Sequence, residues 1–191
     1  MQDTERNNLL YSILGRRGSG KSYFTINKLL PHYQKQHPEQ RILIVDKIDH
    51  KDYRHIPRIS TAMFPRWRGR GMYRVYGEPI STIFEGVNKY VSNSLVLFED
   101  ATRFFDGKTP DDVKDFLFDS KQKNNDLIFQ FHGFSLIPPV ILRNTELLTI
   151  FKCDKPERRK NDIVEYDLVE QAWKAVMRDS NRYANKTVRL Q

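Results

Sequence analysis

The amino-acid sequence predicts an α/β fold in which a mostly parallel β-sheet lies between two layers of helices. Three observations support this fold class. Short apolar runs rich in branched and aromatic residues recur along the chain, helix-like stretches separate them, and the length of 191 residues suits one domain of ordinary size. Strands that alternate with helices are typical of parallel sheets covered on both faces. We therefore expect a single domain over residues 1–191, with its core at about 9–153.

Six apolar runs have the lengths of buried strands. In chain order, they occupy residues 9–14, 41–46, 73–77, 94–100, 126–132 and 147–153. Helices are expected between them, at residues 21–36, 80–92 and 111–123. The third of these helices follows Thr109 and Pro110, a pairing that favours a helix start.

After residue 162, apolar residues recur at helical spacing, and a polar, basic segment follows them to residue 191. The recurring residues are Val164, Leu168, Ala172 and Val176. We expect a C-terminal helix that packs on the sheet or on a neighbouring molecule, followed by a basic tail. The segment 63–74 mixes arginines with Trp67 and Tyr73 and is expected to form a loop.

The stretch GRRGSGKS, residues 15–22, follows the first predicted strand and precedes the first predicted helix. It fits G-x-x-x-x-G-K-[ST], the phosphate-binding loop (Walker A), in the context that this motif requires. Backbone N–H groups of such a loop surround the β-phosphate, Lys21 reaches the β- and γ-phosphates, and Ser22 ligates Mg²⁺. The expected nucleotide-binding residues are Gly15, Arg16, Arg17, Gly18, Ser19, Gly20, Lys21, Ser22 and Tyr23.

The fourth predicted strand ends in two acidic residues, Glu99 and Asp100. A phosphate-binding loop needs a carboxylate on a neighbouring strand end, the Walker B position, to hold Mg²⁺ and its water shell. With two carboxylates, one faces the metal while the other accepts a proton from the attacking water. The pair therefore favours hydrolysis over nucleotide holding alone.

The chain carries 32 Lys and Arg against 24 Asp and Glu, a net charge of +8. Such a charge draws a nucleic acid through its general field, although a solvated basic surface explains it equally well. The single cysteine, Cys153, excludes an internal disulfide and a cysteine metal cluster. The apolar runs fall well short of the roughly 20 residues of a membrane helix, and residues 1–10 lack the pattern of an export signal. We expect no membrane insertion.

Phosphate-binding loops occur in GTPases, small-molecule kinases and motor ATPases alike. A GTPase would carry N-K-x-D late in the chain, whereas the nearest sequence here, DKID at 46–49, lies early. A small-molecule kinase closes an arginine-rich lid on its substrate, and PRWRGRGMYR at 65–74 keeps that class open. The acidic pair argues for water as the acceptor.

The order of the later motifs resembles one family over roughly residues 9–153. The loop is followed by ILIVDKIDHKDYRHI with Asp46, Asp52 and Tyr53, and then by LVLFED, DSKQKNND, LIFQFH and TELLTIFK. This order is similar to the FtsK/HerA superfamily of ring-forming DNA-pumping ATPases, especially its small viral genome-packaging members and the Zot-like proteins of filamentous phages. The resemblance implies a P-loop NTPase (RecA-like) fold, ATP with Mg²⁺, double-stranded DNA and a homo-oligomeric ring, a pentamer or hexamer. It also implies a place at a capsid or portal vertex, in the host cytoplasm or the virion.

The resemblance implies roles for individual residues as well. Lys21 and Ser22 match the phosphate loop of the family. The family usually has Asp-Glu where this chain has Glu99-Asp100, and by position Glu99 takes the magnesium role and Asp100 the water role. His132 falls at the place of a polar γ-phosphate sensor that is typically Gln, and Gln130 lies two residues earlier on the same strand.

Relatives supply an arginine from the helix before that strand to the nucleotide of the adjacent subunit. The candidates for such a finger here are Lys121, Lys123, Arg103 and Arg143. A finger supplied in trans leaves the site of a monomer incomplete, so activity would need a ring. The segment PRWRGRG at 65–71 is the candidate for gripping a phosphate backbone at the centre of that ring.

The sequence thus predicts an ATP-hydrolysing translocase that pumps double-stranded DNA into a preformed capsid. Two alternatives remain open at this point, a P-loop small-molecule kinase and a nucleotide-dependent assembly factor of a virus or mobile element. Turnover that rises with double-stranded DNA separates the translocase from both alternatives.

Overall fold

The computed structural model describes residues 8–190, and a seven-stranded sheet runs through them in the order β3-β2-β4-β5-β1-β6-β7. All neighbouring pairs are parallel except β6 and β7, which are antiparallel. The strands are β1 (Leu10–Leu14), β2 (Arg41–Val45), β3 (Gly71–Val75), β4 (Ser94–Phe98), β5 (Asp126–Phe131), β6 (Leu147–Phe151) and β7 (Asn185–Arg189). The six predicted strands are therefore present, and the seventh is an addition.

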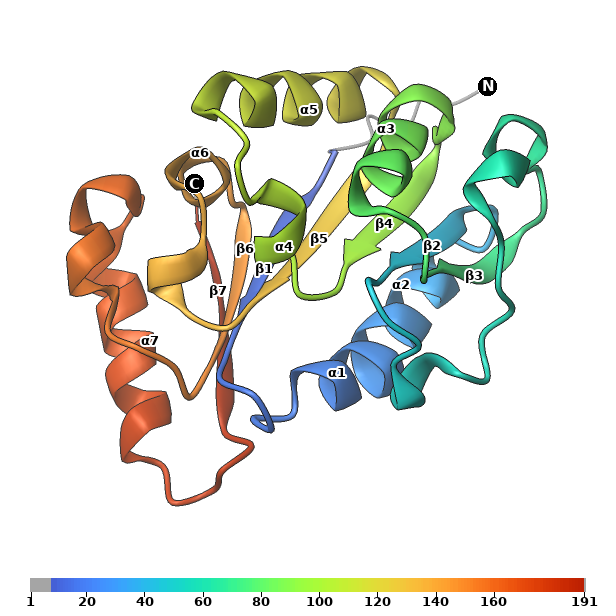
Figure 1. Cartoon of the computed structure of the whole chain (residues 1–191). Helices are drawn as coiled ribbons and strands as arrows, with labels where there is room; N and C mark the ends of the chain where they lie inside the picture. Colours follow the sequence, from blue (N-terminus) through green and yellow to red (C-terminus); the bar gives the residue numbers. More distant parts are fainter. Residues whose placement is uncertain (1–7, 191) are drawn as a thin grey trace.

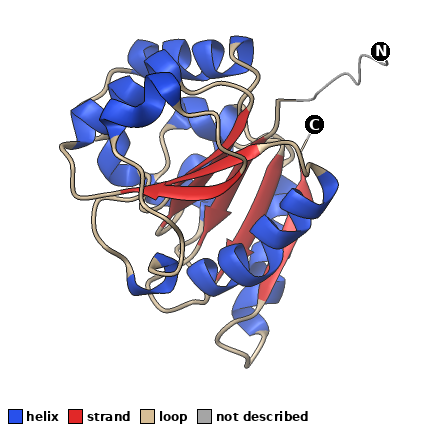
Figure 2. Ribbon diagram, turned by 90° about the vertical axis from the view of Figure 1, so that its right-hand side faces the viewer, coloured by secondary structure: helices blue, strands red, loops and turns tan. Residues whose placement is uncertain are grey.

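Helices cover both faces of this sheet (Figures 1 and 2). They are α1 (Lys21–Phe24), a π-helical turn (Thr25–Leu29), α2 (Leu30–Gln36), α3 (Ile80–Tyr90), α4 (Thr102–Phe105), α5 (Pro110–Gln122), α6 (Pro139–Arg143) and α7 (Tyr166–Arg178). Short 3₁₀ helices occupy Lys51–Tyr53, Thr61–Arg66, Phe134–Leu136 and Pro156–Asp162. The predicted helix 21–36 is present as the continuous run from α1 to α2.

The two faces of the central strands contribute to two separate hydrophobic cores. On β4, Val96 and Phe98 pack with α3, α4 and α5, whereas Leu95 and Leu97 pack on the face covered by α2. This alternation follows from the two-residue period of a strand, and it explains why β4 is buried along its whole length. The predicted three-layer α/β fold is confirmed.

The expectation of a basic tail after the C-terminal helix is wrong in one respect, because residues 185–189 form β7. Thr187 Oγ1 lies 2.6 Å from Thr149 Oγ1 on β6, and Leu190 just beyond the strand is buried. Apolar periodicity could not find this strand, since most of its residues are polar and exposed at the edge of the sheet.

The expectation of a loop over 63–74 is also wrong for most of its length. Residues 61–66 form a 3₁₀ helix, and β3 begins at Gly71. Trp67 is buried beneath the guanidinium of Arg41, which lies 4.8 Å from the ring centroid. Arg74 is buried as well, and its Nη1 donates to Asp49 Oδ1 at 2.6 Å. Over residues 8–190, no helix has both the length and the apolar composition that crossing a bilayer requires.

Candidate nucleotide site

The candidate site lies where β1, β4 and β5 end. These strands are parallel, with β5 between β1 and β4, so their carboxyl ends meet at one edge of the sheet. The phosphate loop follows β1, Glu99 and Asp100 follow β4, and His132 follows β5. Ligands of open α/β sheets bind at this edge. The topology therefore brings together three sequence motifs, represented by Ser22, Glu99 and His132. Each is more than 30 residues from the next in the sequence.

The phosphate loop needs glycine at particular positions. Gly18 and Gly20 have φ angles of 75° and 96°, which favour glycine. At Gly15, a Cβ atom would lie 2.5 Å from Ser19 Oγ and 2.6 Å from Phe151 Cβ, so the loop passes too close to β6 for a side chain. The N–H of Arg16 donates to Lys152 O at 2.9 Å and ties the loop to the residue after β6. The loop is thus anchored to the sheet before any ligand binds.

Lys21 lies folded inside this loop. Its side chain is buried, and Nζ donates to the carbonyl oxygen of Gly15 and, at 3.3 Å, to that of Arg16. Burial lowers the pKa of Lys21, and the nearby carboxylates of Glu99 and Asp100 oppose that shift. An anionic phosphate in the loop would supply the counter-charge that the loop carbonyls only partly replace.

Glu99 is the most tightly held acidic group of the site. Ser22 Oγ donates to its Oε1 at 3.0 Å and Tyr53 Oη donates to its Oε2 at 2.6 Å. Burial raises the pKa of Glu99, while the hydrogen bonds from Tyr53 and Ser22 lower it. Asp46, at the end of β2, is also buried, and this burial raises its pKa. The charge of Asp46 in turn raises the pKa of Glu99.

These oxygens fit a magnesium ion bound together with phosphates. A hydroxyl and a carboxylate at hydrogen-bond distance are ligands that Mg²⁺ prefers, and Oδ2 of Asp46 is buried without a hydrogen-bond partner among residues 8–190. Within that same range, no group of three or more His, Cys, Asp or Glu side chains is arranged to hold a metal alone. Mg²⁺ characteristically takes one or two carboxylates and completes its shell with phosphate oxygens and water.

Asp100, the residue after Glu99, has a strained backbone conformation. Its φ of 49° is unusual for a residue other than glycine. Oδ2 accepts from Arg103 Nε at 2.7 Å, and Oδ1 lies 3.6 Å from His132 Nε2. Burial and the charge of Lys21 lower the pKa of His132, so this ring is neutral at pH 7.

Gln130, two residues before His132, is fully buried on β5, where its Nε2 donates to Thr25 Oγ1 at 3.0 Å. Its side chain also interacts with Tyr53, the residue that donates to Glu99. Of the two polar residues on the strand, His132 is the one beside Asp100.

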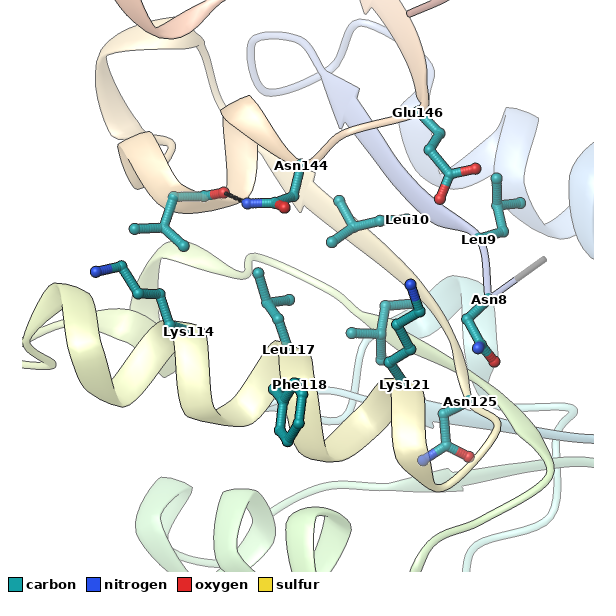
Figure 3. Close-up of a pocket in the computed structure, with 12 residues that line it drawn as sticks. Asn8, Leu9, Leu10, Lys114, Leu117, Phe118, Lys121, Asn125, Asn144 and Glu146 are labelled. Carbon is teal, nitrogen blue, oxygen red and sulfur yellow. Dashed lines mark hydrogen bonds between the residues drawn. The ribbon is translucent and has the colours of Figure 1, made fainter. Parts of the chain in front are cut away.

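The structure does not bring two of the finger candidates to the nucleotide site of their own chain. Lys121 lies on α5 beside Leu10, the first residue of β1, in a pocket at the opposite edge of the sheet (Figure 3). Arg143 Nη2 donates to Asp162 Oδ1 at 2.6 Å. Arg103 is the candidate that lies in the site, through its contact with Asp100.

Three residues of the site escaped the sequence analysis as functional residues. Tyr53 contacts Glu99, although the sequence placed it only within a motif. Arg182 and Tyr183 belong to the turn between α7 and β7, where Arg182 Nη2 donates to Gly18 O at 3.0 Å. The ring of Tyr183 packs over Gly20, with its Cδ1 3.1 Å from the place of a Cβ atom there. Nothing in the polar segment around Tyr183 signals this contact, because it depends on the docking of β7.

The sheet order and the glycine-rich loop between β1 and α1 define the fold of P-loop NTPases. Solved structures with the same fold include the genome packaging NTPase B204 from Sulfolobus turreted icosahedral virus 2 in complex with AMPPCP, with a TM-score of 0.73, 17% identity, and 96% of this chain and 93% of that chain covered. B204 of Sulfolobus turreted icosahedral virus, a DNA-packaging ATPase, has a TM-score of 0.69 and 15% identity over 97% of this chain and 94% of that one. VirB4 of Thermoanaerobacter pseudethanolicus has a TM-score of 0.63 and 9% identity over 95% of this chain and 89% of that one.

No family model and no curated protein matches the sequence. At these identities, the structural matches show a shared fold. The resemblance to viral packaging ATPases that the motif order predicted is confirmed at that level.

Proposed function

We propose that the chain is an ATP-hydrolysing motor that moves double-stranded DNA, of the kind that packages a viral genome into a preformed capsid. The observation that carries the ATPase part is the contact of Ser22 with Glu99 at 3.0 Å, beside a phosphate loop that holds Lys21. The DNA-moving part is supported by the fold shared with B204, described as a genome packaging NTPase, and by the net charge of +8.

In this proposal, the loop from Gly15 to Gly20 and Lys21 bind the β- and γ-phosphates. Ser22 and Glu99 hold Mg²⁺, with Tyr53 fixing the direction of the Glu99 carboxylate. When bound, the metal neutralises charge on the phosphates and orients them for displacement.

Asp100 accepts the proton of the attacking water, as its position after Glu99 implies. Its carboxylate is free for this only after Arg103 releases Oδ2, and Arg103 is then available to the γ-phosphate. His132, neutral and 3.6 Å from Asp100, contacts the same phosphate. Loss of the γ-phosphate breaks this contact, and the change is transmitted to β5, which ends just before His132.

The assembly in this proposal is a ring of identical subunits, a pentamer or a hexamer, at a capsid or portal vertex in the host cytoplasm or the virion. Lys121 and Arg143 lie far from their own nucleotide site, so either would act on the nucleotide of a neighbouring subunit. Residues 1–191 act as one ATPase domain, which the single sheet across residues 8–190 supports. Exposed arginines at 66, 68 and 70 contact the DNA backbone.

The small-molecule kinase alternative loses its specific support in the structure. The proposed lid at 65–74 contains a buried Trp67 and a buried Arg74 paired with Asp49, and most of its second half is β3. A segment held in this way does not open and close over a substrate. The assembly-factor alternative predicts nucleotide binding without turnover.

The test is steady-state ATP hydrolysis with and without double-stranded DNA across a series of protein concentrations. Lys21→Ala and Asp100→Asn should abolish turnover, and Lys89→Ala, on the exposed face of α3, is the matched control for loss of one lysine. Specific activity that rises with protein concentration and again with DNA supports a ring motor. Activity independent of both contradicts the translocase, and nucleotide binding without turnover supports an assembly factor instead.

A further inference from the structure

A cavity of about 580 Å³ lies against the phosphate loop on the side away from Glu99. Its walls come from the start of α1 and from the turn between α7 and β7, and they include Gly20, Tyr23, Phe151, Asn181 and Tyr183. Figure 1 shows the turn after α7 and the phosphate loop at the same end of the sheet. Its volume lies within the range of small-molecule sites.

The order of the strands predicts the orientation of a bound nucleotide in the site. Ser22 and Glu99 mark the magnesium end, on the side of β1 where β5 and β4 lie. The cavity is on the other side of β1, where β6 and β7 lie. Because the phosphate loop lies between them, a nucleotide with its γ-phosphate near Glu99 extends its nucleoside end toward the cavity.

From this geometry we propose that the cavity receives the base and ribose of the nucleotide, and that Tyr183 stacks on the base. This inference rests on the proposed function, since it concerns the same site. Tyr23 and Tyr183 are 65% and 51% exposed, and both line the cavity beside the phosphate loop. Exposed aromatic faces on a concave, partly apolar wall are what a planar base requires.

The turn that carries Tyr183 has a hydrogen-bonded backbone, and the tyrosine ring packs over Gly20. The backbone N–H of Tyr183 donates to Asn181 Oδ1 at 2.9 Å, and its carbonyl oxygen accepts from Asn185 Nδ2 at 3.1 Å. The guanidinium of Arg182 lies 5.0 Å from the centroid of the tyrosine ring and is itself bonded to Gly18 O. A ring fixed in this way loses little freedom when a base stacks on it.

Two further aromatic residues line the cavity. Phe24 and Phe151 meet edge to face, with ring centroids 5.7 Å apart. Asn181 and Asn185 line it as well, and their amide atoms that are not bonded to Tyr183 can meet polar edges of the base or the ribose hydroxyls. The combination of exposed aromatic faces, apolar lining and amides fits a nucleoside better than a peptide or a lipid chain.

The experiment compares two ligands by calorimetry in the presence of Mg²⁺: AMPPCP, which has a base and ribose, and inorganic tripolyphosphate, which has neither. Tyr183→Ala should weaken binding of AMPPCP about tenfold and leave binding of tripolyphosphate within twofold of the wild type. Tyr183→Phe should bind both ligands as the wild type does, because it keeps the aromatic face. Tyr90→Ala, an exposed tyrosine on α3, is the matched control, and thermal unfolding verifies that each variant is folded.

Unchanged AMPPCP affinity in Tyr183→Ala would overturn the inference while leaving the proposed function intact. Equal weakening of both ligands would overturn it too, because Tyr183 would then only support the loop over Gly20. A wild-type chain that binds neither ligand would overturn both the inference and the proposed function. A chain that binds both ligands but never turns over ATP would overturn the proposed function alone.

Discussion

Two buried carboxylates define the chemistry at the scale of single residues. Asp46 and Glu99 are 5% and 9% exposed, and burial raises the pKa of both. Such groups are costly unless they are hydrogen-bonded or face a cation. Tyr53 and Ser22 donate hydrogen bonds to Glu99. A divalent cation would supply the positive charge that the buried carboxylates of Asp46 and Glu99 still lack.

Tyr53→Phe should raise the Mg²⁺ concentration required for half-maximal ATP hydrolysis by about tenfold, as loss of an outer-shell partner typically does. The hydroxyl holds Oε2 of Glu99 at 2.6 Å and lowers the pKa of that carboxyl, so its removal leaves the ligand less well oriented and less readily ionised. A magnesium titration of the ATPase rate measures the shift.

The control for this variant is Tyr11→Phe, which removes another buried hydroxyl, bonded to Thr149 at 2.5 Å. It should lower thermal stability without moving the magnesium requirement. An equal magnesium requirement in Tyr53→Phe and the wild type would contradict the role given to Tyr53.

Cys153 should be unreactive in the folded protein. The thiol is buried, and this burial raises its pKa to about 12, so almost none of the thiolate is present at pH 8. Iodoacetamide should alkylate it at least about 100-fold more slowly in buffer than in concentrated denaturant. Mass spectrometry of timed samples gives both rates, and similar values in the two conditions would contradict the burial of this side chain.

The edge strand β7 is the decisive feature at the scale of elements. It is antiparallel to β6, and its docking brings the turn that carries Arg182 and Tyr183 against the phosphate loop. At the other end of β7, beside the start of β6, the side chain of Leu190 is 2% exposed and its N–H donates to Glu146 O at 2.7 Å. The C-terminal segment is therefore part of the candidate site although it is distant from the loop in sequence.

Leu190→Ala should lower the free energy of unfolding by about 2–4 kcal/mol, the usual cost of truncating a buried leucine. Because β7 carries the turn over the loop, nucleotide affinity should fall as well. Urea unfolding and nucleotide titration measure the two effects, and Arg189→Ala, at the exposed neighbouring position, should change neither. Unchanged stability in Leu190→Ala would mean that this end of the chain contributes little to the fold.

In the whole molecule, the candidate nucleotide site and the candidate DNA-binding arginines lie at opposite edges of the sheet. The candidate nucleotide site lies at the carboxyl edge, whereas the exposed arginines before β3 and the pocket of Lys121 lie at the amino edge. The proposed motor function requires that the two edges be coupled through the sheet and its helices. The net charge of +8 predicts DNA binding that weakens strongly with salt.

Replacing Arg66, Arg68 and Arg70 together with alanine should weaken binding of double-stranded DNA and make its salt dependence shallower. Each lost phosphate contact reduces the slope of log affinity against log salt by about 0.9. Fluorescence anisotropy at several salt concentrations measures the slope, and the triple variant of Lys155, Arg158 and Lys160, equally exposed, is the control. Equal slopes in the wild type and the arginine variant would place the DNA contacts elsewhere.

The layers of the fold could be predicted from the sequence, and the phosphate loop and the acidic pair could be located there, because these depend on local patterns. Apolar runs of strand length, a glycine-rich turn before a helix and two carboxylates after a strand are readable within a few residues. The six parallel strands and the helix from 21 to 36 accordingly match the structure.

Which distant groups meet depends on tertiary packing. Tyr53, after β2, reaches Glu99 at the end of the neighbouring β4, Trp67 is buried under Arg41, and the turn at Tyr183 covers Gly20. Each of these contacts depends on the order of the strands, and an edge strand such as β7 buries too little apolar surface to leave a periodic signal. Local patterns specify elements, whereas the assembly of a site from separate elements is fixed by packing.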